Sequence, residues 1–177
     1  KTYVPHYPSA PGHGDAAPSA FCNHLARSVF HEHMSFAELG LSPRTLEAVT
    51  AAGYTTPTPI QAEAIPRALA GKDLVVQSRT GTGKTAAFGL PMVEKIDLAK
   101  GVQGVVLAPT RELALQVAEE LTSLGRAGGI KVEIIYGGDS MDRQVQGLRA
   151  GAHVVVGTPG RILDHLRRRT LKFDAVK

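Results

Sequence analysis

A loop rich in glycine and threonine constrains the fold of this chain more than any other segment. The loop is Ser78–Thr85, which reads Ser-Arg-Thr-Gly-Thr-Gly-Lys-Thr. It follows Asp73–Gln77, an apolar segment of strand length, and it precedes Ala86-Ala87-Phe88, a stretch that favours a helix. A strand, a glycine-bearing turn and a helix in this order open a β-α unit of a parallel sheet. The segment therefore predicts an α/β fold.

The rest of the chain repeats this alternation of strands and helices. Short β-branched runs predict strands, and a hydroxyl residue followed by proline predicts the start of a helix. The expected strands are Leu74–Val76, Val105–Ala108, Val132–Tyr136 and Val154–Val156. The expected helix starts are Ser42-Pro43, Thr58-Pro59 and Thr158-Pro159. Such an order is typical of a parallel sheet that is buried on both faces.

Composition bounds the domain organisation. With 177 residues, of which 43% are hydrophobic, the chain is large enough for one core. Residues 1–33 hold scattered Pro, Gly, His and Ser without an apolar period, so we expect a disordered tail there and a domain over residues 34–177. The single cysteine, Cys22, excludes an intrachain disulfide framework and favours the cytoplasm, and no apolar stretch is long enough for a membrane span.

The charge is compatible with a nucleic-acid partner but does not require one. The formal net charge is +4 and the pI is about 9.4. Lysines and arginines that neutralise phosphates release condensed counterions, which favours nucleic-acid binding. An ordinary basic domain would have the same charge. The function must therefore be inferred from motifs.

Two groups of residues are expected to bind no ligand. The run Arg167–Arg169 is interpreted as the solvated end of a helix, where the helix dipole favours positive charge. Four residues near the amino end are of metal-ligand types, but their spacing lacks the paired arrangement of a zinc knuckle. They are Cys22, His24, His31 and His33.

The residue types in the glycine-rich loop suit the binding of a nucleoside triphosphate. Glycines let backbone N–H groups approach phosphate oxygens, and the following helix adds positive potential at its amino end. Lys84 can reach the β and γ phosphates, and the Thr85 hydroxyl can ligate the Mg²⁺ of the nucleotide. Ser78 stands where the generic pattern has glycine, and a purely structural turn is the alternative. The expected phosphate-binding residues are Ser78, Arg79, Thr80, Gly81, Thr82, Gly83, Lys84 and Thr85.

Further motifs surround this loop in a fixed order. Gly53–Gln61 and an isolated Phe36 lie upstream, and Pro109–Leu113, Gly137-Gly138 and Thr158–Arg161 lie downstream. In this order they resemble the Q motif with its upstream aromatic, motif Ia, the GG element and motif Ib of bacterial-type DEAD-box ATP-dependent RNA helicases. The resemblance covers residues 34–177. It implies the amino-terminal part of a RecA-like P-loop NTPase domain that is incomplete at its carboxyl end.

The resemblance implies that ATP is the nucleotide. The Gln61 carboxamide offers a donor and an acceptor, so it can pair with the adenine N6 amine and N7, whereas guanine presents the wrong pattern. Phe36 can give the base a stacking face. The alternatives are a polar helix residue for Gln61 and a core aromatic for Phe36. If Gln61 reads adenine, Gln61→Ala should weaken nucleotide affinity and leave folding largely intact.

The resemblance also implies that the downstream motifs bind the RNA backbone without reading its sequence. Each motif follows a strand and, for motifs Ia and Ib, opens a helix, where backbone N–H groups can hold a phosphate. The alternatives are ordinary helix starts, a plain turn at the two glycines and an Arg161 that only pairs with a carboxylate. The expected RNA-binding residues are Pro109, Thr110, Arg111, Glu112, Gly137, Gly138, Thr158, Pro159, Gly160 and Arg161.

The chain is expected to hold only half of a catalytic site. In the family that it resembles, an Asp-Glu pair on the next strand binds magnesium and positions the attacking water, and a second domain supplies an arginine. No Asp-Glu dipeptide occurs in the sequence. We therefore expect Lys84 and Thr85 to bind ATP and Mg²⁺ without hydrolysis by these 177 residues. The alternatives are another P-loop ATPase class, such as a DNA helicase or a transport ATPase, and a truncated, non-catalytic nucleotide- or RNA-binding module.

Overall fold

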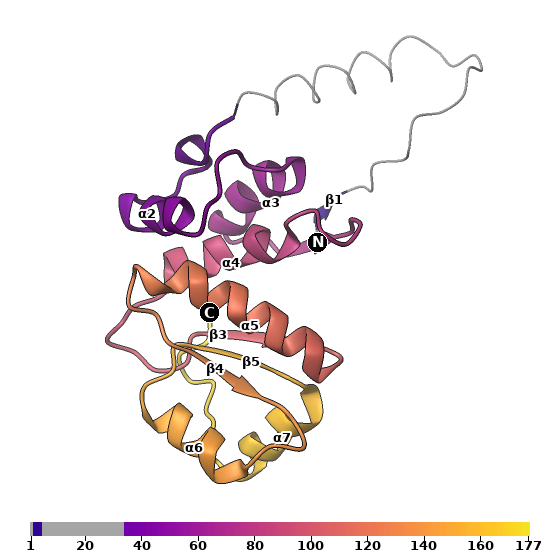
Figure 1. Cartoon of the computed structure of the whole chain (residues 1–177), viewed down its shortest axis with the longest axis vertical. Helices are drawn as coiled ribbons and strands as arrows, with labels where there is room; N and C mark the ends of the chain where they lie inside the picture. Colours follow the sequence, from indigo (N-terminus) through magenta and orange to yellow (C-terminus); the bar gives the residue numbers. More distant parts are fainter. Residues whose placement is uncertain (1, 5–33) are drawn as a thin grey trace, which may run out of the picture.

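The computed structural model describes residues 2–4 and 34–177. From β2 onward, strands and helices alternate along the chain, which confirms the α/β fold class (Figure 1). The strands are β1 (Thr2–Val4), β2 (Leu74–Val76), β3 (Gly104–Leu107), β4 (Val132–Ile135) and β5 (Val154–Gly157). The helices are the short 3-10 helix η1 (Phe36–Leu39), α2 (Pro43–Ala51), α3 (Pro59–Leu69), α4 (Lys84–Lys95), α5 (Arg111–Arg126), α6 (Met141–Arg149) and α7 (Pro159–Arg167).

The helix starts follow the local signals in the sequence. Helices α2, α3 and α7 each begin at the proline that follows a serine or threonine, as predicted. Proline fits this position because the first helical N–H has no partner within the helix. At α3 the side chains of Thr58 and Gln61 also form a capping box, which fixes where the chain enters the helix.

Three of the strands form a parallel sheet in the order β3-β5-β4. The central strand, Val154–Gly157, is buried along its whole length and aligns with Gly104–Leu107 on one side and Val132–Ile135 on the other. Figure 1 shows α5 on one face of this sheet and α6 and α7 on the other. The prediction of a parallel sheet that is buried on both faces is thus confirmed for β5.

Strand β2 lies outside this sheet and is only partly covered. Among the described strands it pairs with β1 alone, in parallel, with Thr2 opposite Leu74 and Val4 opposite Val76. The expectation of an unstructured tail over residues 1–33 is therefore wrong at Thr2–Val4. An open strand edge accepts a segment of high strand propensity such as Thr-Tyr-Val. Residues 1 and 5–33 lie outside the described residues.

The core divides into two clusters on the two faces of the sheet. The larger one joins η1 and helices α2 to α5 to one face, and it includes Leu90, Leu121 and Val156. The smaller one contains Ile135, Val155, Ile162 and Leu171. In the part of the chain that the structure covers, no helix is both long and apolar enough to cross a membrane. The packed clusters leave the loops after the strands free to carry a site.

Candidate nucleotide and nucleic-acid sites

The glycine-rich loop joins β2 to α4 and is closed by its own side chains. The Ser78 and Thr82 hydroxyl oxygens lie 2.7 Å apart, and Thr82 Oγ1 donates to the Arg79 carbonyl at 2.9 Å. Gly81 and Gly83 have φ angles of +77° and +84°, which a residue with a side chain rarely adopts. Ser78 thus stabilises the loop at the position where the generic pattern has glycine.

The loop gathers a positive charge at its centre. Lys84 is the first residue of α4, and its Nζ donates to the Ser78 and Arg79 carbonyls at 2.6 Å each. The ammonium group therefore points back over the loop rather than into solvent. Thr85, the next residue of the helix, is half-buried. A helix amino end, a lysine over the loop and an adjacent hydroxyl form a site that suits phosphate oxygens.

Gln61 links the Q segment to this loop. The side chain is 1% exposed, its Oε1 accepts from the Thr58 backbone N–H at 2.9 Å, and its Nε2 donates to the Gly83 carbonyl at 3.1 Å. Thr58 Oγ1 also donates to the Thr82 carbonyl at 2.9 Å. These bonds use one donor and one acceptor of the carboxamide and leave one of each. Sequence reasoning missed this link, which ties the start of α3 to the P-loop.

Phe36 lies in the core and does not offer an open ring face. It is 4% exposed and meets Tyr54 edge to face, with ring centroids 6.1 Å apart and an interplanar angle of 70°. This placement corresponds to the core-aromatic alternative, so the expectation of a stacking face for adenine is not met in this structure. The physical reason is that the larger core cluster covers the ring.

An apolar groove opens beside Lys84, between β2 and β3. The cavity measures about 520 Å³, and it is lined by β2, β3 and the adjoining faces of α3, α4 and α5. Lys84 and Thr85 lie at its polar part, whereas Leu107 on β3 is 59% exposed. Leu74 and Val76 of β2 line the groove, and Val75, which does not, is 51% exposed. Two strands that do not pair with each other thus leave apolar side chains uncovered next to the P-loop.

The expected RNA-binding segments meet at one edge of the three-stranded sheet. Because β3, β4 and β5 are parallel, the loops that follow them emerge at the same edge. Pro109–Glu112 are exposed after β3, and Gly137-Gly138 are exposed after β4. The structure thus brings together the motifs Ia, GG and Ib.

The residues of motif Ia combine a helix cap with a stacked arginine. Thr110 is the N-cap of α5, and its Oγ1 accepts from the Leu113 N–H at 3.2 Å, which matches an ordinary helix start. The Arg111 guanidinium lies over the Tyr136 ring, 4.6 Å from its centroid. Tyr136 was not expected to contribute to the site. It holds the arginine beside the GG turn, in which Gly138 has a φ of +87°.

Motif Ib begins α7 and reaches across to the loop after β4. Pro159 and Gly160 are exposed, and the Thr158 side chain makes no capping hydrogen bond. Arg161 Nη1 donates to the Asp139 carbonyl at 3.0 Å, and no salt bridge of this arginine is found within the described residues. The alternative of an Arg161 that only pairs with a carboxylate is therefore not supported.

Asp139, next to the GG turn, is held in its ionised form. The Ser140 backbone N–H donates to it and, together with the nearby Arg143 guanidinium, lowers its pKa below the ordinary value. The Asp139 carboxylate forms an ion pair with Arg143, whereas Arg161 donates to the Asp139 backbone carbonyl. The exposed Arg111 and the half-buried Arg161 are thus not neutralised by this carboxylate.

The residues expected to bind no ligand fall in two regions. Arg167–Arg169 are exposed at the end of α7, as predicted for a solvated helix end. Cys22, His24, His31 and His33 lie outside the described residues. Within residues 2–4 and 34–177, no group of three or more His, Cys, Asp or Glu side chains is placed to hold a metal ion.

Comparisons with known proteins agree on one family. A family model described as DEAD/DEAH box helicase matches residues 58–177. The chain is 54% identical over 144 residues to the DEAD-box ATP-dependent RNA helicase CshA of Bacillus cereus and to the protein of the same name in Bacillus anthracis. The matches cover 81% of this chain and 27% of each relative. The chain therefore spans about a quarter of the length of these relatives.

Solved structures give the same picture for the fold. A DEAD box protein from the hyperthermophile Methanococcus jannaschii superposes with a TM-score of 0.77 at 45% identity, over 82% of this chain and 40% of that one. Saccharomyces cerevisiae Dbp5 bound to RNA and ADP BeF3 superposes with a TM-score of 0.73 at 36% identity, over 81% and 36% of the two chains. These likenesses confirm the RecA-like fold that the motifs predicted.

Proposed function

We propose, because the chain belongs to the DEAD/DEAH box helicase family, that it supplies the ATP-binding half-site and part of the RNA-binding surface of an ATP-dependent RNA helicase. The intact enzyme would couple ATP hydrolysis to the local unwinding of RNA duplexes. The observation that carries this proposal is the direct hydrogen bond between Gln61 and Gly83. It joins the segment expected to read the base to the loop expected to hold the phosphates.

The P-loop would bind ATP by an exchange of hydrogen bonds. Lys84 now donates to the carbonyls of Ser78 and Arg79, and an incoming triphosphate would offer stronger, charged acceptors to the same ammonium group. The N–H groups at the start of α4 would add donors and positive potential. Gln61 has a second donor and a second acceptor, but its side chain is 1% exposed, so it would have to become accessible on ATP binding to read the adenine edge.

Magnesium fits the oxygen donor of Thr85. The hydroxyl lies next to Lys84 at the start of α4, and Mg²⁺ is usually held by few protein oxygens together with phosphate oxygens and water. When bound, the ion neutralises charge that builds up on the transferred phosphoryl group. Thr85 would therefore contribute one ligand, and the nucleotide would bring the ion to the site.

The RNA backbone would lie along the edge where β3, β4 and β5 end. Exposed amino ends of α5 and α7, the GG turn and the two arginines Arg111 and Arg161 face this edge. Helix amino ends and guanidinium groups hold phosphates without reading bases. Such a grip is consistent with a sequence-independent partner in the cytoplasm, where we propose that the protein works.

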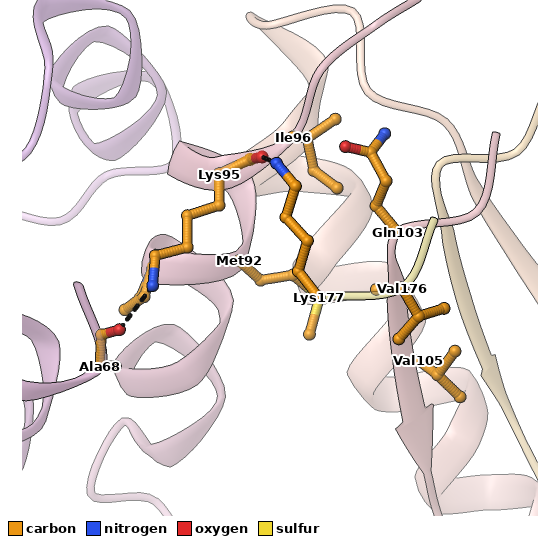
Figure 2. A pocket seen from close by; sticks show the side chains of 10 residues that line it. Ala68, Met92, Lys95, Ile96, Gln103, Val105, Val176 and Lys177 are labelled. Atoms are coloured by element: carbon orange, nitrogen blue, oxygen red, sulfur yellow. Dashed lines mark hydrogen bonds between the residues drawn. The ribbon is translucent and has the colours of Figure 1, made fainter. Parts of the chain in front are cut away.

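The carboxylates for hydrolysis would have to come from outside the described segment. Val176 and Lys177 run beside the start of β3, where the Lys177 N–H donates to the Gln103 carbonyl at 3.1 Å. Figure 2 shows the Lys177 Nζ directed at the Lys95 carbonyl. Lys95, Gln103 and Lys177 all line a cavity of about 220 Å³. A strand that continued from Lys177 would therefore add to the β3 edge and approach the groove beside the P-loop.

Calorimetric titration of the 177-residue chain with ATP and GTP tests the proposal, with Lys84→Ala as the blank. We expect ATP to bind more tightly than GTP and to lose its affinity in the blank. Phosphate release in the presence of single-stranded RNA should be absent from these residues and present in the intact protein. Lys84-dependent, RNA-stimulated release by the 177 residues would instead show that a catalytic carboxylate lies within them, with Glu112 the first candidate.

A further inference from the structure

Two buried polar side chains lie behind the proposed RNA-binding edge. Gln144 on α6 and His165 on α7 are both 0% exposed, and His165 Nε2 lies 3.1 Å from Gln144 Oε1. Burying polar groups costs free energy unless their donors and acceptors are paired. The partners of these two side chains are therefore informative about their role.

Gln144 connects the GG turn to motif Ib. Its Nε2 donates to the Tyr136 carbonyl at 3.0 Å, at the point where β4 ends and the GG turn begins. Its Oε1 accepts from Arg161 Nη1 at 3.3 Å as well as from His165. One carboxamide thus holds the backbone before Gly137 and the guanidinium of the first turn of α7 at the same time.

The partners of the Gln144 carboxamide fix its orientation. If the Gln144 amide were reversed, its NH₂ group would face the Arg161 donors and its oxygen would face the Tyr136 carbonyl. The oxygen therefore accepts from both partners, and the proton of His165 lies on Nε2. In the neutral form, His165 Nδ1 accepts from the Thr170 hydroxyl at 2.8 Å, and the single hydroxyl proton is then shared with the His165 carbonyl, 3.1 Å away. Burial and the positive charge of Arg161 lower the pKa of His165, which favours this neutral form.

We propose that Gln144 and His165 are positioning residues for RNA binding, which orient Arg161 and the GG turn toward consecutive phosphates without touching RNA themselves. The inference rests on the proposed RNA-binding function. Arg161 donates to Gln144 and to the Asp139 carbonyl, so its guanidinium is fixed between α6 and the loop after β4. Without Gln144, the arginine loses an acceptor and the Tyr136 carbonyl loses its side-chain donor. The orientation of Arg161 relative to the GG turn would then no longer be fixed.

The test is a double-mutant cycle in the intact protein, with a short fluorescein-labelled oligouridylate as the probe in the presence of ADP and beryllium fluoride. We expect Gln144→Met to weaken RNA binding about tenfold, because a hydrogen bond to a charged group is lost. In an Arg161→Ala background the same substitution should have little further effect, because Gln144 acts through Arg161. ATP affinity measured without RNA should be unchanged in Gln144→Met.

A second pair of variants covers the case in which Gln144→Met does not fold. His165→Gln keeps an N–H donor for Gln144 and should bind RNA nearly as well as the wild type, whereas His165→Leu should bind about tenfold more weakly. If His165 only stabilised the fold, His165→Gln and His165→Leu variants with equal melting temperatures would bind RNA equally well. Equal RNA affinities for the two His165 variants, or additive effects of Gln144→Met and Arg161→Ala, would overturn the inference. Failure of the wild type to bind the probe would instead contradict the proposed function.

Discussion

Truncation of Gln61 should destabilise the domain as well as weaken nucleotide binding. From the sequence, Gln61→Ala was expected to leave folding largely intact. The structure changes this expectation, because the side chain is 1% exposed and bonds both Thr58 and Gly83. The substitution removes one partner from each of two half-buried backbone groups and leaves a cavity behind.

The size of the effect follows from those two bonds. An unsatisfied buried donor or acceptor costs about 1–3 kcal/mol. The half-buried Thr58 N–H would lose its partner, whereas the Gly83 carbonyl would still accept from the Ala87 N–H. With the lost packing of the Gln61 side chain, we expect a decrease of about 2–4 kcal/mol in the free energy of unfolding. For a domain of this size, this corresponds to a melting temperature lower by about 4–16 °C.

Thermal unfolding followed by circular dichroism, alongside ATP titration, measures both consequences. Gln116→Ala is the matched control, because it makes the same chemical change at an exposed position of α5. Gln61→Glu separates the two bonds, since it keeps an acceptor for the Thr58 N–H and loses the donor to Gly83. If Gln61→Ala melted at the same temperature as Gln116→Ala, the link between the Q segment and the P-loop would carry no stability and the reasoning would be refuted.

Three other expectations follow from local geometry. Burial opposes ionisation of Glu94, yet hydrogen bonds from the backbone N–H and hydroxyl of Ser42, the cap of α2, lower its pKa. Its contribution to stability should therefore be lost as the pH falls through this lowered pKa, and the difference in unfolding free energy from Glu94→Gln should shrink accordingly. Gly157→Ala should lower the free energy of unfolding by about 1–3 kcal/mol, because a Cβ would collide with the backbone carbonyl of Ile135 on β4. Gly160→Ala has open space and should leave this free energy nearly unchanged when both variants are unfolded with denaturant. The 177-residue chain should self-associate through its uncovered strands, and Leu107→Lys should reduce the self-association that sedimentation detects. A wild-type chain that sediments as a monomer would contradict this.

Local signals in the sequence predicted the elements well because they act over a few residues. A proline after a hydroxyl residue marks the starts of α2, α3 and α7, although Thr56-Pro57 starts no helix, and the β-branched run Val154–Val156 forms the buried strand β5. The position of β2 could not be predicted in the same way. Strand pairing depends on which edges are available in the folded chain, so Thr2–Val4 pairing with β2 is a tertiary effect.

Side-chain environment was harder to predict than chain path. The sequence allows Phe36 to be a base-stacking ring or a core aromatic, and Gln61 to be a base-reading amide or a polar helix residue. The residue types alone do not distinguish these alternatives. An apolar ring gains free energy from burial, which agrees with the core position of Phe36. Gln61 is buried too, but its two polar atoms are satisfied by backbone groups of the segments it joins. Because Phe36 is buried, it has no open ring face, and because Gln61 is buried and hydrogen-bonded, it also stabilises the fold.

The Gln144–His165 pair shows why part of the site is invisible to sequence patterns. On a helix with a polar sequence, a glutamine is expected to face solvent, and only the packing of α6 and α7 under the sheet buries this one. Two well-packed apolar side chains in these positions could be about as stable as a hydrogen-bonded polar pair. Stability alone therefore does not require the pair. What an apolar pair could not do is hold the Tyr136 carbonyl and the Arg161 guanidinium in one fixed relation, and both of these groups lie at the edge where RNA is proposed to bind.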